Sequence, residues 1–233
     1  MANDHKDPNK CKILTVDLEN LKVIQRHISK KIKIIDLNNK SIKSVSGIDV
    51  AYDDEIAIVA VATFDYEDKQ CINKSIEFEH VKFPYIPGFL GFREGPLIIG
   101  AIKRKRINSD MYMLNSHGIA HPERCGCASY VGVLINKPTI GIASKVLCGS
   151  YERDPVGVGE WAPLIHDDER VGAILKSKRG CKPIVVSPGN MITLEKSIRI
   201  VKEFMKDEKF PEPLRAAHQI AIDKRREIRD FFN

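Results

Sequence analysis

The 233-residue sequence contains no long run of hydrophobic residues. Its longest apolar stretches, such as residues 56–64, are far shorter than the roughly 18 residues that indicate a membrane-spanning helix. The polar N-terminus also lacks the pattern of a secretory signal peptide. We therefore expect a soluble, cytoplasmic protein that does not bind membranes.

Cysteine motifs are missing as well. The six cysteines include no CxxC pair and are too sparse for the disulfide framework of a small secreted module. We expect reduced structural thiols rather than a zinc site. The cysteines are Cys11, Cys71, Cys125, Cys127, Cys148 and Cys181.

The sequence has no internal repeat, low-complexity tract or domain linker. Its length and 43% hydrophobic content suit a single domain over residues 1–233, with a core that needs no covalent staples. The net charge of +6 and pI near 8.9 are compatible with binding to a polyanionic partner such as nucleic acid. Many proteins that never touch nucleic acid are equally basic, so charge alone does not decide the function.

The N-terminal half predicts one helix followed by three antiparallel strands. Residues 17–31 repeat apolar side chains at helical spacing and end in two lysines, which suits a helix C-terminus. Residues 45–51, 56–64 and 75–81 have strand patterns separated by short polar connections. These three strands are typical of an antiparallel meander.

From residue 95 onward, predicted helices and strands alternate. In this alternation the helices are 96–106 and 127–135 and the strands are 111–114 and 139–143; further strands at 171–175 and 183–187 precede helices at 193–206 and 212–229. Alternation predicts parallel pairing through crossover helices, while the Gly- and Pro-rich residues 153–168 indicate a surface loop. A meander followed by parallel strands is typical of an RNase H-like α/β fold, a mixed sheet flanked by helices, in which carboxylates at strand ends gather around a divalent metal.

Asp49 is the first candidate functional residue. It lies within GIDVAY, in the middle of an otherwise apolar strand. A charge there is costly unless it is paired or bound to a cation. The alternative is a carboxylate that caps a neighbouring loop.

The segment FPYIPGFLGFREGPLI, residues 83–98, combines a rigid double-proline turn with glycines that allow close backbone approach. Prolines on both sides of Tyr85 and Ile86 make a stiff wedge suited to insertion between bases or strands. The alternative is a packed turn in which Tyr85 fills the core. Glu94 follows, and we expect it just before a helix that starts at Gly95-Pro96.

Two later segments also carry candidate binding residues. In NSHGIAHPERCGCASYVG, residues 115–132, Ser116, Gly118 and Gly126 would let a planar base lie against backbone amides. His121 could hydrogen-bond that base or a phosphate, or could be a loop residue satisfied by its own backbone. In FPEPLRAAH, Arg215 and His218 share one helical face, where surface or packing roles are the alternative.

Six segments occur in the order and spacing found in endonuclease V: GIDVAY, FPYIPGFLGFREGPL, HGIAHP with CASYVGV, PTIGIASKVL, VSPGN and PEPLRAAH. The chain resembles that family from Gly47 to Ala221. The resemblance implies an RNase H-like, magnesium- or manganese-dependent endonuclease that hydrolyses a phosphodiester bond on the 3′ side of inosine. The family uses this reaction in DNA repair of deaminated adenine, and some members act on inosine-containing RNA.

The resemblance also implies roles for single residues. Asp49 and Glu94 match metal-site carboxylates with His218 beside them, and Tyr85 belongs to a strand-separating wedge. Oxygen ligands of this kind suit Mg²⁺, with Mn²⁺ as a substitute. The partner would be inosine-containing DNA or RNA, bound by a monomer. The implied hypoxanthine pocket is lined by Gly88, Leu90, Ser116, His121, Gly126 and Cys127.

Two positions depart from the family pattern. Asn115 stands in NSHGIAHP where the family has a metal-ligating Asp, as in DGHGIAHP. Asn115 can still offer a carbonyl oxygen to the metal, but without the charge. Ser144 separates Ala143 from Lys145, a candidate for phosphate contact or support of the catalytic site, whereas the family more usually has Lys directly after Ala. In a strand this shift would turn the lysine to the other face, but in a loop its length could compensate.

These departures leave two functional hypotheses. The first is an active endonuclease that is slower or more manganese-dependent than its relatives. The alternative is a catalytically weakened protein that binds inosine or branched nucleic acid. A third hypothesis, a basic interaction protein that keeps the fold but not the function of the family, is disfavoured. The wedge and the pocket loop match the family pattern almost completely.

Overall fold

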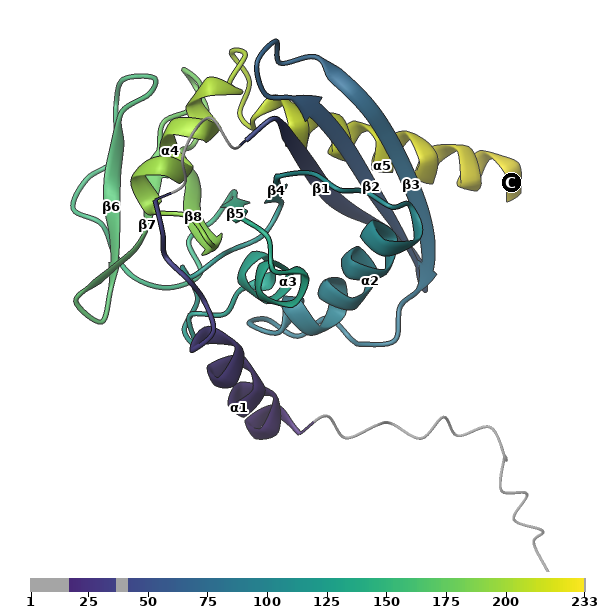
Figure 1. Cartoon of the computed structure of the whole chain (residues 1–233), viewed down its shortest axis with the longest axis horizontal. Coiled ribbons are helices and arrows are strands. Elements are labelled where there is room, and N and C mark those ends of the chain that lie inside the picture. The colour runs from purple at the N-terminus through teal and green to yellow at the C-terminus, as the bar shows by residue number, and fades with distance from the viewer. Residues whose placement is uncertain (1–16, 37–41, 233) are drawn as a thin grey trace, which may run out of the picture.

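In the computed structural model, which describes residues 17–36 and 42–232, the strands form one eight-stranded mixed sheet (Figure 1). The strand order is β3-β2-β1-β4-β5-β8-β7-β6. The strands are β1 (Ser44–Asp53), β2 (Ile56–Asp65), β3 (Cys71–His80), β4 (Met111–Leu114), β5 (Thr139–Ala143), β6 (Trp161–His166), β7 (Glu169–Leu175) and β8 (Ile184–Asn190). The helices are α1 (Leu18–Ser29), α2 (Leu90–Arg104), α3 (Cys127–Ile135), α4 (Leu194–Glu203) and α5 (Glu212–Phe232).

The directions of the strands confirm the predicted mixed α/β fold. The first three strands pair antiparallel as a meander, and β1, β4 and β5 pair parallel. The remaining pairs, from β5 through β8 and β7 to β6, are antiparallel. The parallel pairing places the C-terminal end of β4 next to the middle of β1, where Asp49 lies.

Helices cover both faces of the sheet, with α2 and α3 on one face and α5 behind β1 and β2 on the other (Figure 1). Along β2, Val59 and Val61 join the core beneath α2 and α3, while Ala62 and Phe64 join the core that includes α4 and α5. Because both faces of β2 are buried, its sequence is a continuous apolar run rather than an alternating one.

Gly47 allows α5 to approach β1 backbone to backbone. A Cβ atom at this position would lie 2.1 Å from the carbonyl carbon of Pro213, so any side chain would push the helix away. Asp49 lies two residues further along β1, and His218 lies on the first turns of α5. The close approach at Gly47 therefore holds the α5 histidine over the β1 carboxylate.

The start of α2 differs from the prediction. The helix begins at Leu90 and contains Pro96 in its interior, so Glu94 lies inside the helix rather than before it. Proline lacks an N–H and disfavours a helix interior, but tertiary packing of the preceding turn outweighs this cost. The ring of Phe92 lies 6.2 Å from that of Phe89 and 5.5 Å from that of Tyr130 on α3.

The predicted surface loop at 153–168 was also partly wrong, because it contains strand β6. This strand is at the edge of the sheet and pairs with β7. An edge strand tolerates Pro163, since an N–H that faces away from the neighbouring strand has no ladder partner to lose. The Gly- and Pro-rich composition therefore concealed a strand.

The five described cysteines are free thiols, and Cys11 lies outside the described residues. Among residues 17–36 and 42–232, no helix combines the length and apolar character that crossing a membrane requires.

Candidate active site

Asp49 is a buried carboxylate that is hydrogen-bonded by two exposed side chains, Asn115 and His218. It is 7% exposed, and both of its carboxylate oxygens accept hydrogen bonds. The side-chain amide of Asn115 donates to Oδ1 at 2.9 Å, and Nδ1 of His218 donates to Oδ2 at 2.6 Å. The hydrogen bond to Asp49 raises the pKa of His218. Three segments that are distant in sequence therefore meet at one carboxylate, which we call the Asp49 cluster.

Glu94 is close to this cluster but has its own partner. It accepts a hydrogen bond from the hydroxyl of Tyr52 at 2.9 Å, and Arg93 stacks over the Tyr52 ring. Burial raises the pKa of Glu94 to about 7; the Tyr52 hydrogen bond opposes this shift and the negative charge of Asp49 adds to it. Two neighbouring carboxylates that disfavour each other's charge are an arrangement that a cation would stabilise.

The donor set fits a divalent cation, with weaker ligands than three carboxylates would give. Asp49 and Glu94 offer carboxylate oxygens, and Asn115 offers a carbonyl oxygen if its amide turns. Magnesium prefers oxygen ligands of these kinds. Over residues 17–36 and 42–232, no three His, Cys, Asp or Glu side chains form a ready metal site. Asn115, which is an amide, adds no third carboxylate to Asp49 and Glu94.

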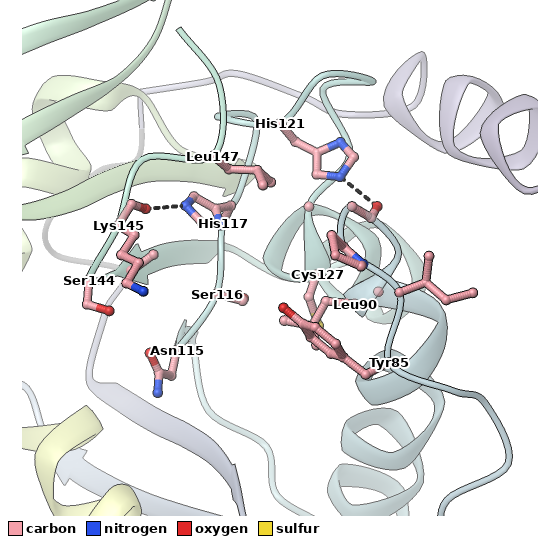
Figure 2. A pocket seen from close by; sticks show the side chains of 16 residues that line it. Tyr85, Leu90, Asn115, Ser116, His117, His121, Cys127, Ser144, Lys145 and Leu147 are labelled. Carbon is pink, nitrogen blue, oxygen red and sulfur yellow. Dashed lines mark hydrogen bonds between the residues drawn. The ribbon is translucent and has the colours of Figure 1, made fainter. Parts of the chain in front are cut away.

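A pocket of about 240 Å³ opens beside the Asp49 cluster (Figure 2). Figure 2 shows Tyr85 and Leu90 on one side of it and Ser144 and Lys145 on the other. Asn115 lines the pocket and also bonds Asp49, whereas Asp49, Glu94 and His218 lie outside the lining. The lining contains every residue predicted to bind the base, namely Tyr85, Gly88, Leu90, Ser116, His121, Gly126 and Cys127.

Two helix N-termini meet at the pocket. The first residues of α2 and α3, Leu90 and Cys127, both line it, and neither helix has a side-chain N-cap hydrogen bond. The first N–H groups of a helix lack intrahelical acceptors and carry partial positive charge. The pocket wall therefore offers backbone donors to an acceptor atom of a ligand.

Ser116 adds a hydroxyl that is poorly satisfied by the protein. Its side chain is 4% exposed, and within the described part of the chain its Oγ has no hydrogen-bond partner of normal geometry. It lies near the thiol of Cys127, whose pKa burial raises well above its usual value. Leaving a buried hydroxyl unpaired costs about 1–3 kcal/mol, which a bound ligand could recover.

Two histidines brace the pocket rather than point freely into it. Nε2 of His121 donates to the carbonyl of Gly88 at 2.8 Å, and its Nδ1 accepts from the N–H of Glu123 at 3.1 Å. Nε2 of His117 donates to the carbonyl of Lys145 at 2.8 Å. Burial lowers the pKa of both histidines, so both are neutral at neutral pH. Sequence reasoning missed His117, although it lies in the HGIAHP motif next to Ser116.

The structure decides between alternatives for two predicted residues. Tyr85 is 68% exposed, so the alternative in which it fills the core is wrong. Strand β5 ends at Ala143, so Ser144 shifts Lys145 within a loop rather than within a strand. Lys145 lines the pocket despite the shift.

The sequence model of the family described as endonuclease V matches residues 26–219. The chain belongs to the endonuclease V family. It is 38% identical over 210 residues to endonuclease V of Roseiflexus castenholzii, covering 90% of this chain and 94% of that protein. Family members are endonucleases, so the reaction class is hydrolysis of a phosphodiester bond.

Solved structures of the family have the same fold. The crystal structure of endonuclease V from Bacillus subtilis is 28% identical with a TM-score of 0.87, covering 94% of this chain and 97% of that one. Endonuclease V of Ciona intestinalis was solved with a 24mer DNA containing an inosine followed by a ribo-adenosine. It is 23% identical with a TM-score of 0.78, covering 91% of this chain and 98% of that one, which shows a common fold.

Proposed function

We propose that the chain is a divalent-metal-dependent endonuclease that holds an inosine base in its pocket and hydrolyses a phosphodiester bond on the 3′ side. Such a reaction would serve the repair of deaminated adenine. The observation that carries the proposal is the position of Asn115, which lines the pocket and bonds Asp49. Base recognition and hydrolysis would thus share one wall. The Ciona relative, solved with inosine-containing DNA, supports the same class of ligand.

The donors of the pocket favour hypoxanthine over adenine. Hypoxanthine presents a carbonyl oxygen where adenine presents an amino group, which is a donor. Backbone N–H groups at Leu90 and Cys127 can donate to that carbonyl, whereas an amino group would meet them donor to donor. The Ser116 hydroxyl can donate or accept, so it can pair with either kind of group on the base edge.

The exposed Tyr85 would help to present the base. A base inside a duplex must be unpaired and unstacked before it can enter a pocket, which costs a few kcal/mol and costs least at a mismatch. Tyr85 is flanked by Pro84 and Ile86-Pro87, which stiffen the turn that carries it. We propose that this turn fills the gap left by the departing base.

Asp49, Glu94 and Asn115 would hold the metal. A bound divalent cation supplies a polarised water and stabilises negative charge on the phosphate. His218 orients Asp49 through its 2.6 Å hydrogen bond and fixes one carboxylate oxygen. Lys145, exposed at the pocket rim, would neutralise a backbone phosphate.

The assay uses an end-labelled strand with one inosine, as single-stranded DNA, duplex DNA and RNA, beside matched adenosine strands. We expect one product, cut on the 3′ side of inosine, with Mg²⁺ or Mn²⁺, and no product with EDTA or adenosine. The DNA and RNA arms show which backbone is preferred. Absence of any preference for inosine, in binding or in cleavage, would show that the pocket is wrongly assigned.

One observation favours the alternative of a catalytically weakened inosine-binding protein. The Asn115 amide occupies an oxygen of Asp49 that a metal would need. In that case the inosine strand binds preferentially but stays intact in both metals. Size-exclusion chromatography with light scattering tests the expected monomer in the same samples.

A further inference from the structure

Helix α1 lies away from the sheet, beyond α3 (Figure 1). Most of it precedes the family match, which begins at residue 26. Gln25, immediately before that boundary, is nevertheless 1% exposed. Burying an amide costs free energy unless it is hydrogen-bonded, so packing alone would be better served by an apolar residue. We therefore expect the buried Gln25 amide to be retained for the hydrogen bonds that it makes.

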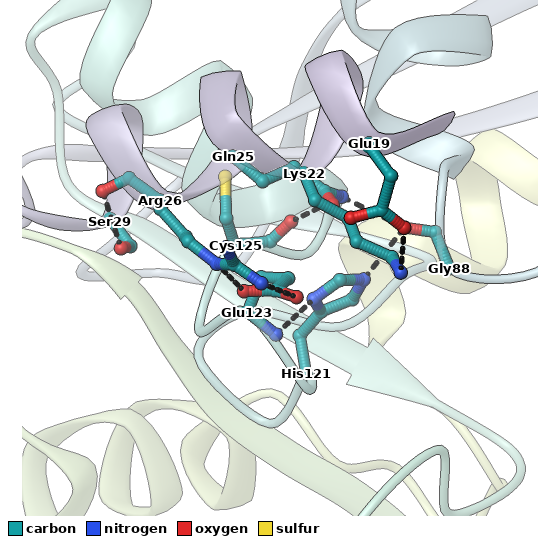
Figure 3. Close-up of polar contacts among 9 residues, drawn as sticks. All are labelled: Glu19, Lys22, Gln25, Arg26, Ser29, Gly88, His121, Glu123 and Cys125. Carbon is teal, nitrogen blue, oxygen red and sulfur yellow. Dashed lines mark hydrogen bonds and ion pairs between the residues drawn. The ribbon is translucent and has the colours of Figure 1, made fainter. Parts of the chain in front are cut away.

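The Gln25 side chain joins two segments of the pocket wall (Figure 3). Its Nε2 donates to the carbonyl of Gly88 at 2.8 Å and to the carbonyl of Cys125 at 3.5 Å. These carbonyls lie 63 and 100 residues further along the chain. One amide thus connects the turn that carries Tyr85 with the loop that follows His121.

The two carbonyls occupy equivalent places in the pocket. Gly88 lies two residues before Leu90, where α2 begins, and Cys125 lies two residues before Cys127, where α3 begins. In the proposed function, the amides of Leu90 and Cys127 at these two helix starts donate to the base. Any rotation of the Gly88 or Cys125 peptide would therefore re-aim those donors.

The orientation of the Gly88 peptide depends on hydrogen bonds from neighbouring side chains. Its φ of +84° is rarely adopted by other residues, and glycine imposes little preference of its own. Its carbonyl accepts a second hydrogen bond from His121 Nε2 at 2.8 Å. His121 is fixed in turn by the N–H of Glu123, whose carboxylate pairs with Arg26 of α1 at 2.7 Å. Helix α1 thus holds both the Gly88 carbonyl and the histidine that shares it.

We propose that Gln25 is a positioning residue that sets the spacing of the α2 and α3 N-termini and thereby the preference of the pocket for inosine over adenosine. This inference rests on the proposed function of the pocket. Gln25 does not line the pocket, so it acts through the Gly88 and Cys125 peptides. A merely structural role would change thermal stability and all nucleic-acid binding together, without changing the preference.

The test compares Gln25→Met with Gln70→Met. Methionine keeps the length of the side chain and its helix propensity but donates no hydrogen bond. Gln70 is exposed in the turn between β2 and β3, so it provides the same substitution away from the pocket. Affinities for inosine-containing and matched adenosine-containing single strands are measured by fluorescence anisotropy in EDTA, so that cleavage cannot interfere.

We expect Gln25→Met to reduce the ratio of inosine to adenosine affinity about five- to tenfold, the loss of roughly one hydrogen bond. Binding of the adenosine strand, which reports backbone contacts, should stay unchanged, as should both affinities of Gln70→Met. An unchanged ratio, or an equal loss on both strands, overturns the inference. If the unmodified protein itself shows no preference for inosine, the proposed function fails instead.

Hydrogen–deuterium exchange of the unmodified protein gives a second measurement that does not depend on folding of the variant. We expect the inosine strand to slow amide exchange in α1 more than the adenosine strand does, because base binding stabilises the peptides that Gln25 holds. Equal exchange in α1 with both strands would overturn the inference.

Discussion

The pocket and the Asp49 cluster share Asn115, but they differ in readiness for a ligand. In the pocket, α2 and α3 begin without side-chain caps, and among the described residues the Ser116 hydroxyl has no partner of normal geometry. Hydrogen-bonded, neutral histidines hold the pocket walls. In the Asp49 cluster, both carboxylate oxygens are already occupied by groups of the protein. On the proposed function, the pocket is open to a base, whereas a metal would first have to displace the Asn115 amide.

Because of this difference, a substitution can affect base recognition without affecting phosphodiester hydrolysis, or the reverse. The pocket depends on backbone amides, which substitutions of exposed side chains leave in place. Metal binding depends on a few charges, and one charge at a divalent ion contributes several kcal/mol at moderate effective dielectric. Substitutions in the Asp49 cluster should therefore change catalysis strongly and base binding weakly.

The largest effect is expected for Asp49→Asn. Removing the central charge should lower the cleavage rate by about 100-fold or more, since each 1.36 kcal/mol of lost transition-state stabilisation is about tenfold in rate. Affinity for the inosine strand in EDTA should stay within about twofold. Single-turnover cleavage and anisotropy measure the two effects, with Asp54→Asn in the exposed turn after β1 as the control. A comparable loss of binding would mean that the two regions are not separate.

Asn115→Asp should strengthen metal binding by the Asp49 cluster, whereas Asp49→Asn should weaken it. A third carboxylate adds a charged metal ligand, so the Mg²⁺ concentration at half-maximal cleavage should fall by about tenfold. In EDTA, the thermal midpoint should fall by about 2–4 °C, because carboxylate repulsion replaces a hydrogen bond worth about 1 kcal/mol. Asn73→Asp on the edge strand β3 is the matched control. No change in either measurement would show that position 115 does not limit metal binding.

Tyr85→Ala tests the wedge. Stacking of an aromatic side chain on a base contributes about 1–3 kcal/mol, so affinity for inosine-containing duplex should fall by about tenfold. The loss for single strand should be smaller, since no strands are parted. Phe78→Ala, an exposed aromatic on β3, should change neither affinity. Equal losses on duplex and single strand would remove the strand-separating role.

Ser116→Ala should have opposite effects on stability and binding. Removing an unpaired buried hydroxyl should raise the thermal midpoint by about 1–3 °C, whereas affinity for the inosine strand should fall by about three- to fivefold. Ser129→Ala on α3 is a close control, because that hydroxyl is also buried and unpaired among the described residues but does not line the pocket. It should reproduce the stability change alone. Unchanged binding with Ser116→Ala would show that this hydroxyl does not contact the base.

The smallest effect concerns pH. The Asp49 hydrogen bond raises the folded-state pKa of His218, so the pair stabilises the fold fully below the ordinary histidine pKa, and this contribution is lost as pH rises through the folded-state pKa. In EDTA, His218→Gln should therefore lower the thermal midpoint more at about pH 5.5 than at about pH 8.5. His27→Gln, on α1, serves as the control. A larger loss at the higher pH would contradict the assigned charge state.

Much of the fold followed from local pattern. Strands β4 and β5 and helix α3 were predicted with the bounds that the structure shows, because hydrophobic periodicity and turn residues are short-range signals. The start of α2 and the edge strand β6 were not, because Pro96 and Pro163 are tolerated only in the context of their neighbours. There, tertiary packing outweighed local propensity.

By itself, the sequence determined the family, the mixed α/β fold and the seven predicted base-binding residues that line the pocket, since these are carried by continuous motifs. Only the tertiary structure showed that Asn115 and His218 occupy both oxygens of Asp49, that His121 is already bonded, and that Gln25 connects the two pocket helices. These contacts join residues that are 33 to 169 positions apart. Local sequence encodes the conformation of each segment, but the partner of a buried polar group is decided where segments meet in space.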